Sequence, residues 1–357
     1  MRVLAWVPQE TDTSPGQRFR IEQWEPFLRA EGIEITWSPF ADHELGELLK
    51  QKGALRAKSV RVARALRRRL REAWSASSFD LVYVFREGAL LGPALAERIL
   101  GWKGVPFVFD FDDAVWVRYL SPANWALSYL RFPGKTATLC RRARHVLAGN
   151  PYLESYARHF NRRVSVVPTT IDTDKYRVPP ARSGVPVVGW TGSYSTAKYL
   201  ALVGPVLERL RKRHEFRVVI VGASGFEVPG VEVEHRPWRS ATEVLDLSDF
   251  DVGLMPLTNT EWERGKCGLK ALQYMALGIP AVVSPVGVNA EIVRHWENGL
   301  VASSREEWER ALDRLLADAE LRRRLGAAGR ATVEATYSAR VQAPRVARIF
   351  RDAAEAP

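Results

Sequence analysis

The sequence predicts an α/β protein with two doubly wound domains, each a parallel sheet with helices on both faces. Short apolar segments alternate with helical segments twice along the chain, once on each side of a proline-rich stretch at residues 179–185. Buried parallel strands are apolar throughout and helices connect them, so this alternation is typical of parallel sheets. The length of 357 residues also fits two domains better than one core. We expect domains at residues 1–178 and 186–335, with a helix in residues 336–357 that returns to the first domain.

The expected strands are short apolar runs, and the segments between them have helical periodicity. In the first domain we expect strands at residues 3–7, 33–37, 81–85, 107–109, 146–148 and 164–167. In the second domain we expect strands at residues 187–190, 218–221, 231–234, 252–255 and 281–284. The expected helices cover residues 19–31, 44–73, 197–213, 267–277, 305–317 and 338–352. Ligands of doubly wound sheets lie at the carboxyl ends of the strands, so the loops that follow strands are the places for functional residues.

The composition is that of an ordinary globular protein, with 46% hydrophobic and 26% charged residues. Cys140 and Cys267 lie far apart and have neither metal-ligand nor redox spacing, which favours a reducing compartment. The apolar run at residues 3–8 is too short for a signal peptide or a membrane span. We therefore expect a cytoplasmic protein, either dissolved or bound peripherally at the inner face of the membrane.

The net charge of +11 is concentrated in the first half, where residues 1–180 hold 28 Lys and Arg against 19 Asp and Glu. Residues 50–71 hold ten Lys or Arg and no acid. Four apolar side chains recur there at helical spacing, at Leu55, Val62, Leu66 and Leu70. Such a helix either lies on anionic lipid, with Arg67, Arg68 and Arg69 in contact with it, or packs its stripe against the sheet. Nucleic acid is not expected, since no aromatic and basic binding motif accompanies the charge.

Two loops of the second domain carry the residue types that bind phosphate. After its first strand come Thr191, Gly192 and Ser193, which lead into a helical segment with Lys198. Glycine lets the backbone approach a ligand, and the N–H groups at a helix start hold anions. The alternative is a plain strand-to-helix turn with a hydroxyl cap.

The second loop precedes the expected helix at residues 267–277, where Lys266, Gly268 and Lys270 surround the helix start. Lysines at a helix N-terminus oppose the helix dipole, so their presence favours an anion at this point. The alternative is a solvated lysine pair. We expect a doubly charged anion, such as a diphosphate, to bind here.

The stretch WERGKCGLKALQYMALGIPAVVSPVGVNAEIV at residues 262–293, with ENGLV at 297–301, resembles the donor-binding region of family 4 retaining glycosyltransferases. VVPTTIDTDKY at residues 166–176 resembles the segment before the interdomain linker of those enzymes. The resemblance covers about residues 146–336 and is greatest to a bacterial subgroup with a GKCGxKxxQYM pattern. It implies a GT-B fold, in which two Rossmann-like domains face each other across a cleft, and transfer of a hexose from a nucleoside-diphosphate sugar with retention and without a metal.

For single residues, the resemblance implies that Lys198, Lys266 and Lys270 stabilise the charge of the leaving diphosphate. Gln273 stands where most of the family has a glutamate that holds the ribose hydroxyls, and an amide can also bind hydroxyls. Thr191, Gly192, Ser193 and Gly268 would complete the donor site. Gly265 stands where the family has the glutamate that contacts the sugar, so the sequence leaves the replacement for that contact open.

Two loops of the first domain carry further candidates. After the first strand, Gly16, Arg18 and Arg20 match the position of the family's loop near acceptor and diphosphate, and arginine binds phosphate or carboxylate through its planar fork. The alternative is that both arginines open a surface helix. After the fourth expected strand stand the acidic residues Asp110, Asp112 and Asp113.

Three neighbouring carboxylates can bind a divalent cation. The resemblance instead implies no metal and no cofactor, with Asp112 and Asp113 as catalytic residues near sugar hydroxyls. The expected function is therefore metal-independent glycosyl transfer in cell-surface polysaccharide biosynthesis. Its partners would be a nucleotide sugar, an acceptor that is a carbohydrate, lipid-linked or a small molecule, and an anionic membrane surface. An epimerase of the same fold and a non-catalytic carbohydrate- or membrane-binding protein are the alternatives. The sequence does not specify the base, the sugar, the acceptor or the oligomeric state.

Overall fold

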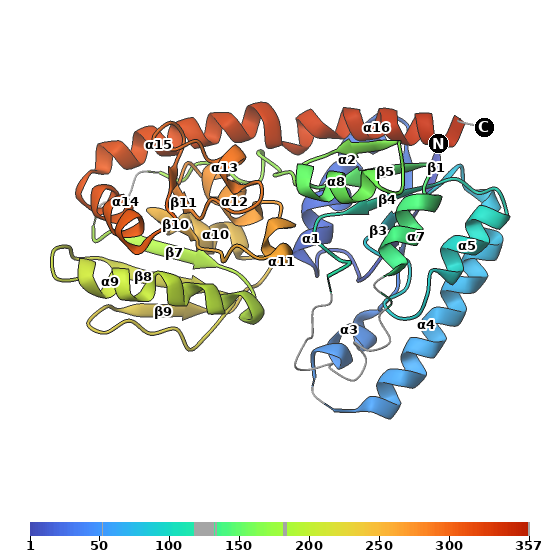
Figure 1. Ribbon diagram of the computed structural model, residues 1–357, viewed down its shortest axis with the longest axis horizontal. Helices are drawn as coiled ribbons and strands as arrows, with labels where there is room; N and C mark the ends of the chain where they lie inside the picture. Colours follow the sequence, from blue (N-terminus) through green and yellow to red (C-terminus); the bar gives the residue numbers. More distant parts are fainter. Residues whose placement is uncertain (52, 118–131, 133, 181–183, 356–357) are drawn as a thin grey trace. The chain divides into compact units, whose positions relative to one another are not determined.

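The computed structural model describes the chain except for residues 52, 118–131, 133, 181–183 and 356–357. It divides into two compact units, each with its own parallel sheet (Figure 1). Unit 1 comprises Met1–Pro168 and Gln342–Pro357, and unit 2 comprises Thr169–Val341.

Unit 1 contains a six-stranded sheet in the order β2-β1-β3-β4-β5-β6, with every neighbouring pair parallel. The strands are β1 Arg2–Val7, β2 Glu34–Pro39, β3 Leu81–Phe85, β4 Phe107–Phe111, β5 His145–Ala148 and β6 Val164–Val166. The helices are α1 Pro15–Gln17, α2 Gln23–Ala30, α3 His43–Lys50, α4 Leu55–Ser75, α5 Leu95–Trp102, α7 Gly134–Arg142, α8 Pro151–Arg158 and most of α16 Ala339–Glu355.

The middle of this sheet is buried on both faces, because every residue of β3 and β4 is buried. The C-terminal helix α16 completes one of these faces. The rings of Phe350 and Tyr83 lie 5.7 Å apart, and Arg351 donates a hydrogen bond of 2.6 Å to the carbonyl of Glu31. The last residues of the chain therefore belong to the same core as the first.

Unit 2 contains a second six-stranded parallel sheet, in the order β12-β11-β10-β7-β8-β9. The strands are β7 Val187–Thr191, β8 Arg217–Val221, β9 Val233–Arg236, β10 Val252–Met255, β11 Ala281–Val283 and β12 Leu300–Val301. The helices are α9 Gly204–Leu210, α10 Glu243–Ser248, α11 Glu261–Arg264, α12 Leu269–Ala276, α13 Asn289–Ile292, α14 Arg305–Ala317 and α15 Ala319–Thr332. A 3-10 helix, Tyr194–Leu202, follows β7.

A pair of glycines fixes α12 on this sheet. Gly189 of β7 and Gly253 of β10 are register partners, and each lies under an aromatic ring where a methyl group would collide. Those rings belong to Phe250 and Tyr274, and the Tyr274 hydroxyl accepts a hydrogen bond of 3.0 Å from the backbone N–H of Thr191. Without Cβ atoms at the two strands, Tyr274 reaches the end of β7 and holds α12 close to it.

The structure differs from the sequence-based expectation at the boundary between the units. Residues 169–178, expected in the first domain, lie in unit 2. The reason is Arg330, whose guanidinium donates hydrogen bonds to the carbonyls of Thr173, Tyr176 and Ala276. The expected linker at residues 179–185 contains residues 181–183, which lie outside the described residues.

The expected helix at residues 44–73 is two helices, α3 and α4. Gly53 and Ala54 between them have φ angles of 79° and 52°, in the left-handed region that a helix does not continue through. The strand order reverses between β1 and β3 in unit 1 and between β7 and β10 in unit 2. Such reversal points are where doubly wound sheets bind ligands.

Candidate functional site

At the reversal point of unit 2, glycines follow two neighbouring strands: Gly192 follows β7 and Gly222 follows β8. The N–H of Gly192 donates a hydrogen bond of 3.0 Å to Val221 on the neighbouring strand. A Cβ on Gly192 would lie 2.6 Å from the ring of Trp190, and a Cβ on Gly222 would collide with the Gly192 carbonyl. Ser193 is the N-cap residue that precedes the 3-10 helix. The two glycines therefore let Trp190 and the neighbouring strand pack closely at the end of β7, where the predicted residues Thr191, Gly192 and Ser193 lie.

The predicted lysines lie in the segments that follow β7 and β10, and each lies over an aromatic ring. The Nζ atom of Lys270 is 5.6 Å from the ring centroid of Trp190, that of Lys266 is 5.3 Å from Trp262, and that of Lys198 is 5.0 Å from Tyr199. Cations are attracted to aromatic faces, which gives the long lysine side chains preferred positions. The two strands are neighbours, so the three ammonium groups belong to one edge of the sheet.

A buried carboxylate, that of Glu263 on α11, lies among these lysines. It accepts hydrogen bonds from the hydroxyls of Tyr199 and Thr260. Burial by itself raises the pKa of this carboxyl, but the two hydrogen bonds and the charge of Lys198 outweigh it, so the pKa is lowered. The Glu263 carboxylate, as an anion, thus connects α11 to the 3-10 helix through its hydrogen bond with Tyr199. Glu263 was not among the predicted site residues, although Thr260 and Glu263 have the spacing of a helix capping box.

Gly268 has a φ angle of 71° at the N-terminus of α12, and a Cβ there would collide with Ile292. Only glycine fits this position. Gly268, predicted as a donor-binding residue, thus lies at the start of α12 between Lys266 and Lys270.

Gln273 is buried, and its amide takes part in a chain of hydrogen bonds inside unit 2. Its Nε2 donates to the hydroxyl of Tyr176 at 3.0 Å, and this hydroxyl donates to Glu243 at 2.9 Å. The other oxygen of Glu243 accepts from the indole N–H of Trp238 at 2.8 Å. One N–H of the Gln273 amide is therefore engaged, which leaves its second N–H and its carbonyl oxygen for the predicted contact with a ribose hydroxyl.

At the reversal point of unit 1, Arg86 is a further candidate site residue, which was not predicted from the sequence. Arg86 directly follows β3 with a φ angle of 58°, and it contacts Asp112 at 2.5 Å and Asp113 at 2.9 Å. A Cβ on Gly16 would lie 2.7 Å from the guanidinium of Arg86 and 2.8 Å from the carboxylate of Asp112. Burial would raise the pKa of Asp112, but the charge and hydrogen bond of Arg86 lower it. Gly16, Asp112 and Asp113 therefore come together around Arg86.

The other two residues predicted in the first loop have different surroundings. Arg20 is fully buried, where it binds both oxygens of Asp110 at 2.9 and 2.6 Å and the carbonyl of Val167 at 2.6 Å. This corrects the expectation that Arg20 contacts an acceptor or a phosphate, because its guanidinium is enclosed by the core. Arg18 is mostly buried and pairs with Asp12 at 2.9 Å.

The acidic cluster after β4 is divided between two arginines. Asp110 lies inside the unit with Arg20 and the hydroxyl of Tyr83, and burial raises its pKa, whereas Asp112 and Asp113 face Arg86. Within the part of the chain that the structure describes, no three His, Cys, Asp or Glu side chains are grouped as ligands for a metal ion. The three carboxylates thus do not share one cation site in this structure.

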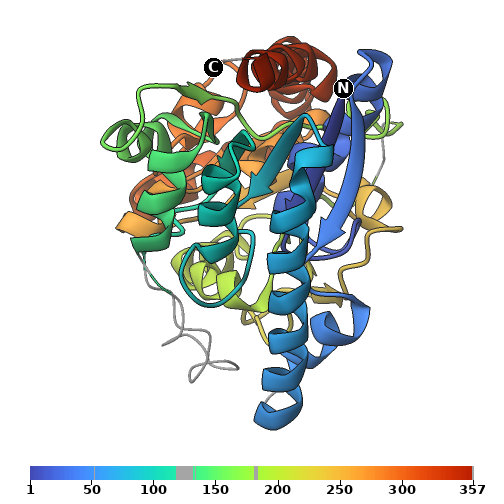
Figure 2. The same cartoon turned by 90° about the vertical axis from the view of Figure 1, so that its right-hand side faces the viewer.

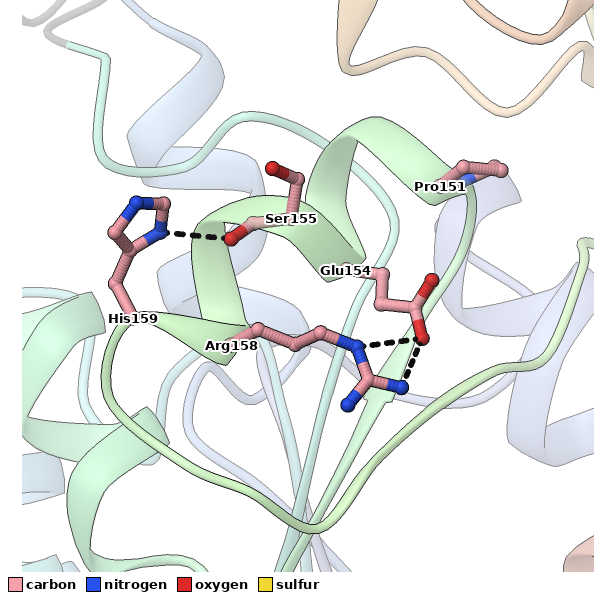
Figure 3. A pocket seen from close by; sticks show the side chains of 5 residues that line it. All are labelled: Pro151, Glu154, Ser155, Arg158 and His159. Carbon is pink, nitrogen blue, oxygen red and sulfur yellow. Dashed lines mark hydrogen bonds and ion pairs between the residues drawn. The ribbon is translucent and has the colours of Figure 1, made fainter.

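A hollow of about 410 Å³ is lined by side chains of α8 and by His159, which follows it (Figure 3). The charged side chains in it pair with their own helix: Arg158 binds Glu154 at 2.6 Å, and the ring of His159 contacts the carbonyl of Ser155 at 2.8 Å. None of the predicted site residues lines this hollow, and we assign no ligand to it.

The basic helix packs differently from the expectation. The face of α4 that is buried contains Lys58, Val62, Ala65, Arg69 and Ala73, whereas Leu55 is exposed. Arg69 donates hydrogen bonds to Ser38, Glu72 and the carbonyl of Gly88, and burial lowers its pKa to about 10. Arg69 therefore cannot contact lipid as predicted. No helix among the described residues has the length and apolar character to cross a membrane.

Two family models match the sequence. A model described as Glycosyltransferase Family 4 matches residues 26–175, and one described as Glycosyl transferases group 1 matches residues 185–318. The chain is a glycosyltransferase, the class that the sequence predicted. A search of curated proteins finds no match.

Solved structures show the same architecture at low sequence identity. HepE from Anabaena, in complex with UDP and glucose, is 16% identical with a TM-score of 0.70, covering 99% of this chain and 100% of that one. Sucrose-phosphate synthase from Thermosynechococcus elongatus is 16% identical, with a TM-score of 0.69 and coverage of 98% of both chains. WaaG, a glycosyltransferase involved in lipopolysaccharide biosynthesis, is 15% identical, with a TM-score of 0.63 over 98% and 99% of the two chains. The chain therefore has the two-domain GT-B fold, as predicted.

Proposed function

We propose that this glycosyltransferase moves a hexose from a nucleoside-diphosphate sugar to an acceptor hydroxyl, with retention and without a metal. The observation that carries the proposal is the set of lysines Lys198, Lys266 and Lys270 on aromatic rings at the reversal point of unit 2. The complex of HepE with UDP and glucose supports uridine diphosphate as the first nucleotide to test.

The chemical difficulty is the departure of a nucleoside diphosphate while the anomeric carbon becomes cationic. Lysine ammonium groups held in place before the reaction stabilise the charge on the leaving oxygen, and the N–H groups at the start of α12 add to this effect. The nucleoside is proposed to lie against Thr191, Gly192 and Gln273. The acceptor hydroxyl attacks from the side of the leaving phosphate, which takes up its proton, so the anomeric configuration is retained.

Unit 1 is proposed to bind the acceptor at Gly16, Arg86, Asp112 and Asp113. The carboxylates accept hydrogen bonds from sugar hydroxyls, and Arg86 fixes both carboxylates in one orientation. The role of WaaG in lipopolysaccharide biosynthesis supports an acceptor in a cell-surface glycan, with the enzyme in the cytoplasm at the inner face of the membrane.

The test replaces Lys266 or Lys270 by Ala. Losing a hydrogen bond to a charged group costs about 1.5–3 kcal/mol, which corresponds to a loss of roughly tenfold to a hundredfold in kcat/KM for the nucleotide sugar. Affinity for the nucleoside diphosphate, measured by titration calorimetry, should fall with it, while affinity for the nucleoside should not. The matched control is Lys212→Ala, an exposed lysine after α9.

Full turnover and full diphosphate affinity in both variants would show that Lys266 and Lys270 are a solvated pair. The stereochemistry has its own measurement. NMR of the newly formed glycosidic bond should show the anomeric configuration of the donor, and the opposite configuration would rule out same-face attack.

A further inference from the structure

Two tryptophans are exposed next to each other on the surface of unit 1. Trp74 in the last turn of α4 is 55% exposed, and Trp102 at the end of α5 is 72% exposed. Their ring centroids lie 5.3 Å apart, and the Nζ atom of Lys103 lies 5.3 Å from the ring of Trp74. Large aromatic side chains are rarely left so accessible without a partner, so this pair points to a binding surface.

A row of arginines extends from Trp74 along α4. Arg64, Arg67 and Arg71 precede Trp74 at spacings of three or four residues, which places all four side chains on one face of the helix. All of them are exposed, and this face is distinct from the buried face that contains Arg69. Figure 2 shows α4 along its length, with α5 next to it.

The charge of this surface is not balanced by its own helices. Within the described residues, Arg64, Arg67 and Arg71 form no ion pair. The acid of α4, Glu72, binds Arg68 and Arg69, and the acid of α5, Glu97, is buried.

Helix α5 and the chain after it contribute further positive charge. Arg98 on α5 is exposed, and the guanidinium of Arg142 lies 3.3 Å from the position of a Cβ on Gly101. We call Arg64, Arg67, Arg71, Trp74, Arg98, Trp102 and Lys103 the Trp74–Trp102 surface.

We propose that the Trp74–Trp102 surface docks the enzyme on an anionic phospholipid bilayer. Tryptophan favours the interfacial layer of a membrane, where its ring is in an apolar region and its N–H remains near water. Basic side chains around it bind the phosphates of anionic headgroups. The two rings pack against each other, so they do not present the separate aromatic platforms on which successive nucleic acid bases stack. The proposal concerns unit 1 and does not depend on the donor site in unit 2.

The experiment measures binding of the full-length protein to sedimenting vesicles of phosphatidylglycerol and phosphatidylcholine, against phosphatidylcholine alone. The triple charge reversal R64E/R67E/R71E should weaken binding to anionic vesicles by roughly a hundredfold. The double variant W74S/W102S should weaken it about tenfold, since the interfacial anchor is lost. The matched control K212E/R305E/R310E changes the net charge equally, at exposed residues of unit 2, and should bind like the wild type.

Binding of the wild type should also fall as salt rises above 0.1 M, because the interaction with headgroups is screened within about 10 Å. Equal binding to neutral vesicles, or equal losses in the control and in R64E/R67E/R71E, would overturn the proposal. So would binding of a single-stranded oligonucleotide by the same residues without any binding to vesicles. An unchanged denaturant unfolding transition in all variants confirms that unit 1 is folded, and unchanged nucleoside-diphosphate affinity separates this test from that of the donor site.

Discussion

Arg20 and Arg86 are both paired with aspartates near the carboxyl ends of strands of unit 1, but only Arg86 is accessible. The sequence singled out Arg20, because it follows the first strand and glycine. In the structure the π-helical turn Arg18–Glu22 gives Arg20 a φ of −124° and a ψ of −113°, and its side chain enters the core. Arg86 has no motif around it, and its role depends on a left-handed backbone that places it between Asp112 and Asp113. Residue type was therefore readable from the sequence, whereas side-chain direction was not.

The pair of Arg86 and Asp112 predicts a specific dependence of stability on pH. The pKa of Asp112 is lowered in the folded protein, so its contribution to stability is present above the ordinary pKa of about 4 and is lost as the pH falls through the lower folded value. Asp112→Asn should reduce the free energy of unfolding by about 1.5–3 kcal/mol at pH 7, and the difference from the wild type should shrink below about pH 4. Denaturant unfolding between pH 3 and pH 7 measures this.

The control is Glu232→Gln, which removes an exposed carboxylate and should leave the free energy of unfolding unchanged over the same range. A constant difference between Asp112→Asn and the wild type at every pH would mean that the ionised form of Asp112 does not stabilise unit 1.

At the scale of elements, the N-terminus of α12 depends on one glycine. Gly268→Ala should destabilise unit 2 by about 2–5 kcal/mol, because the left-handed backbone disfavours Ala and the methyl group collides with Ile292. Gly230→Ala is the matched control, since Gly230 has the same φ of 71° but its nearest contact is 3.9 Å away. It should cost only about 1–2 kcal/mol.

Denaturant unfolding of both variants gives the comparison, and diphosphate affinity gives a second one. Gly268→Ala should weaken the affinity, while Gly230→Ala should not. Equal losses of stability in the two variants would mean that the contact with Ile292 relaxes without cost.

The strands were predictable and several helix limits were not, for different physical reasons. Buried parallel strands such as β3 and β10 are continuous apolar runs, so composition alone located them at Leu81–Phe85 and Val252–Met255. Strand β12 has two residues, which is too short for any pattern. The break between α3 and α4 depends on Gly53 and Ala54, and the helical periodicity continues on both sides of it. The order of strands, which sets where the loops meet, is a property of tertiary contacts.

For the site, the sequence pointed to the loops after β7 and β10, because glycine and lysine at the start of a helix favour a bound anion. It did not predict Glu263 or Arg86, whose roles follow from partners far away in the chain, such as Tyr199 and Asp112. Only the folded chain brings such partners together.

At the scale of the whole molecule, the proposed donor site leads to a prediction about metals. If lysines and helix N–H groups balance the charge of the diphosphate, turnover should stay within about twofold after treatment with a chelator. The measurement is the initial rate with and without EDTA, with a metal-dependent glycosyltransferase as the assay control. Loss of turnover that added manganese restores would show that a cation takes part.

Unit 1 is formed by two separate parts of the chain, Met1–Pro168 and Gln342–Pro357. During translation, the first part of unit 1 leaves the ribosome before the residues of its second part, which are synthesised after unit 2 and include Phe350, which packs on Tyr83. Unit 2, Thr169–Val341, is continuous and has all of its residues earlier. Domains generally fold as units during synthesis, usually in order from the N-terminus. In this chain unit 2 therefore has all of its residues before unit 1 does, and until α16 is synthesised Phe350 does not cover Tyr83.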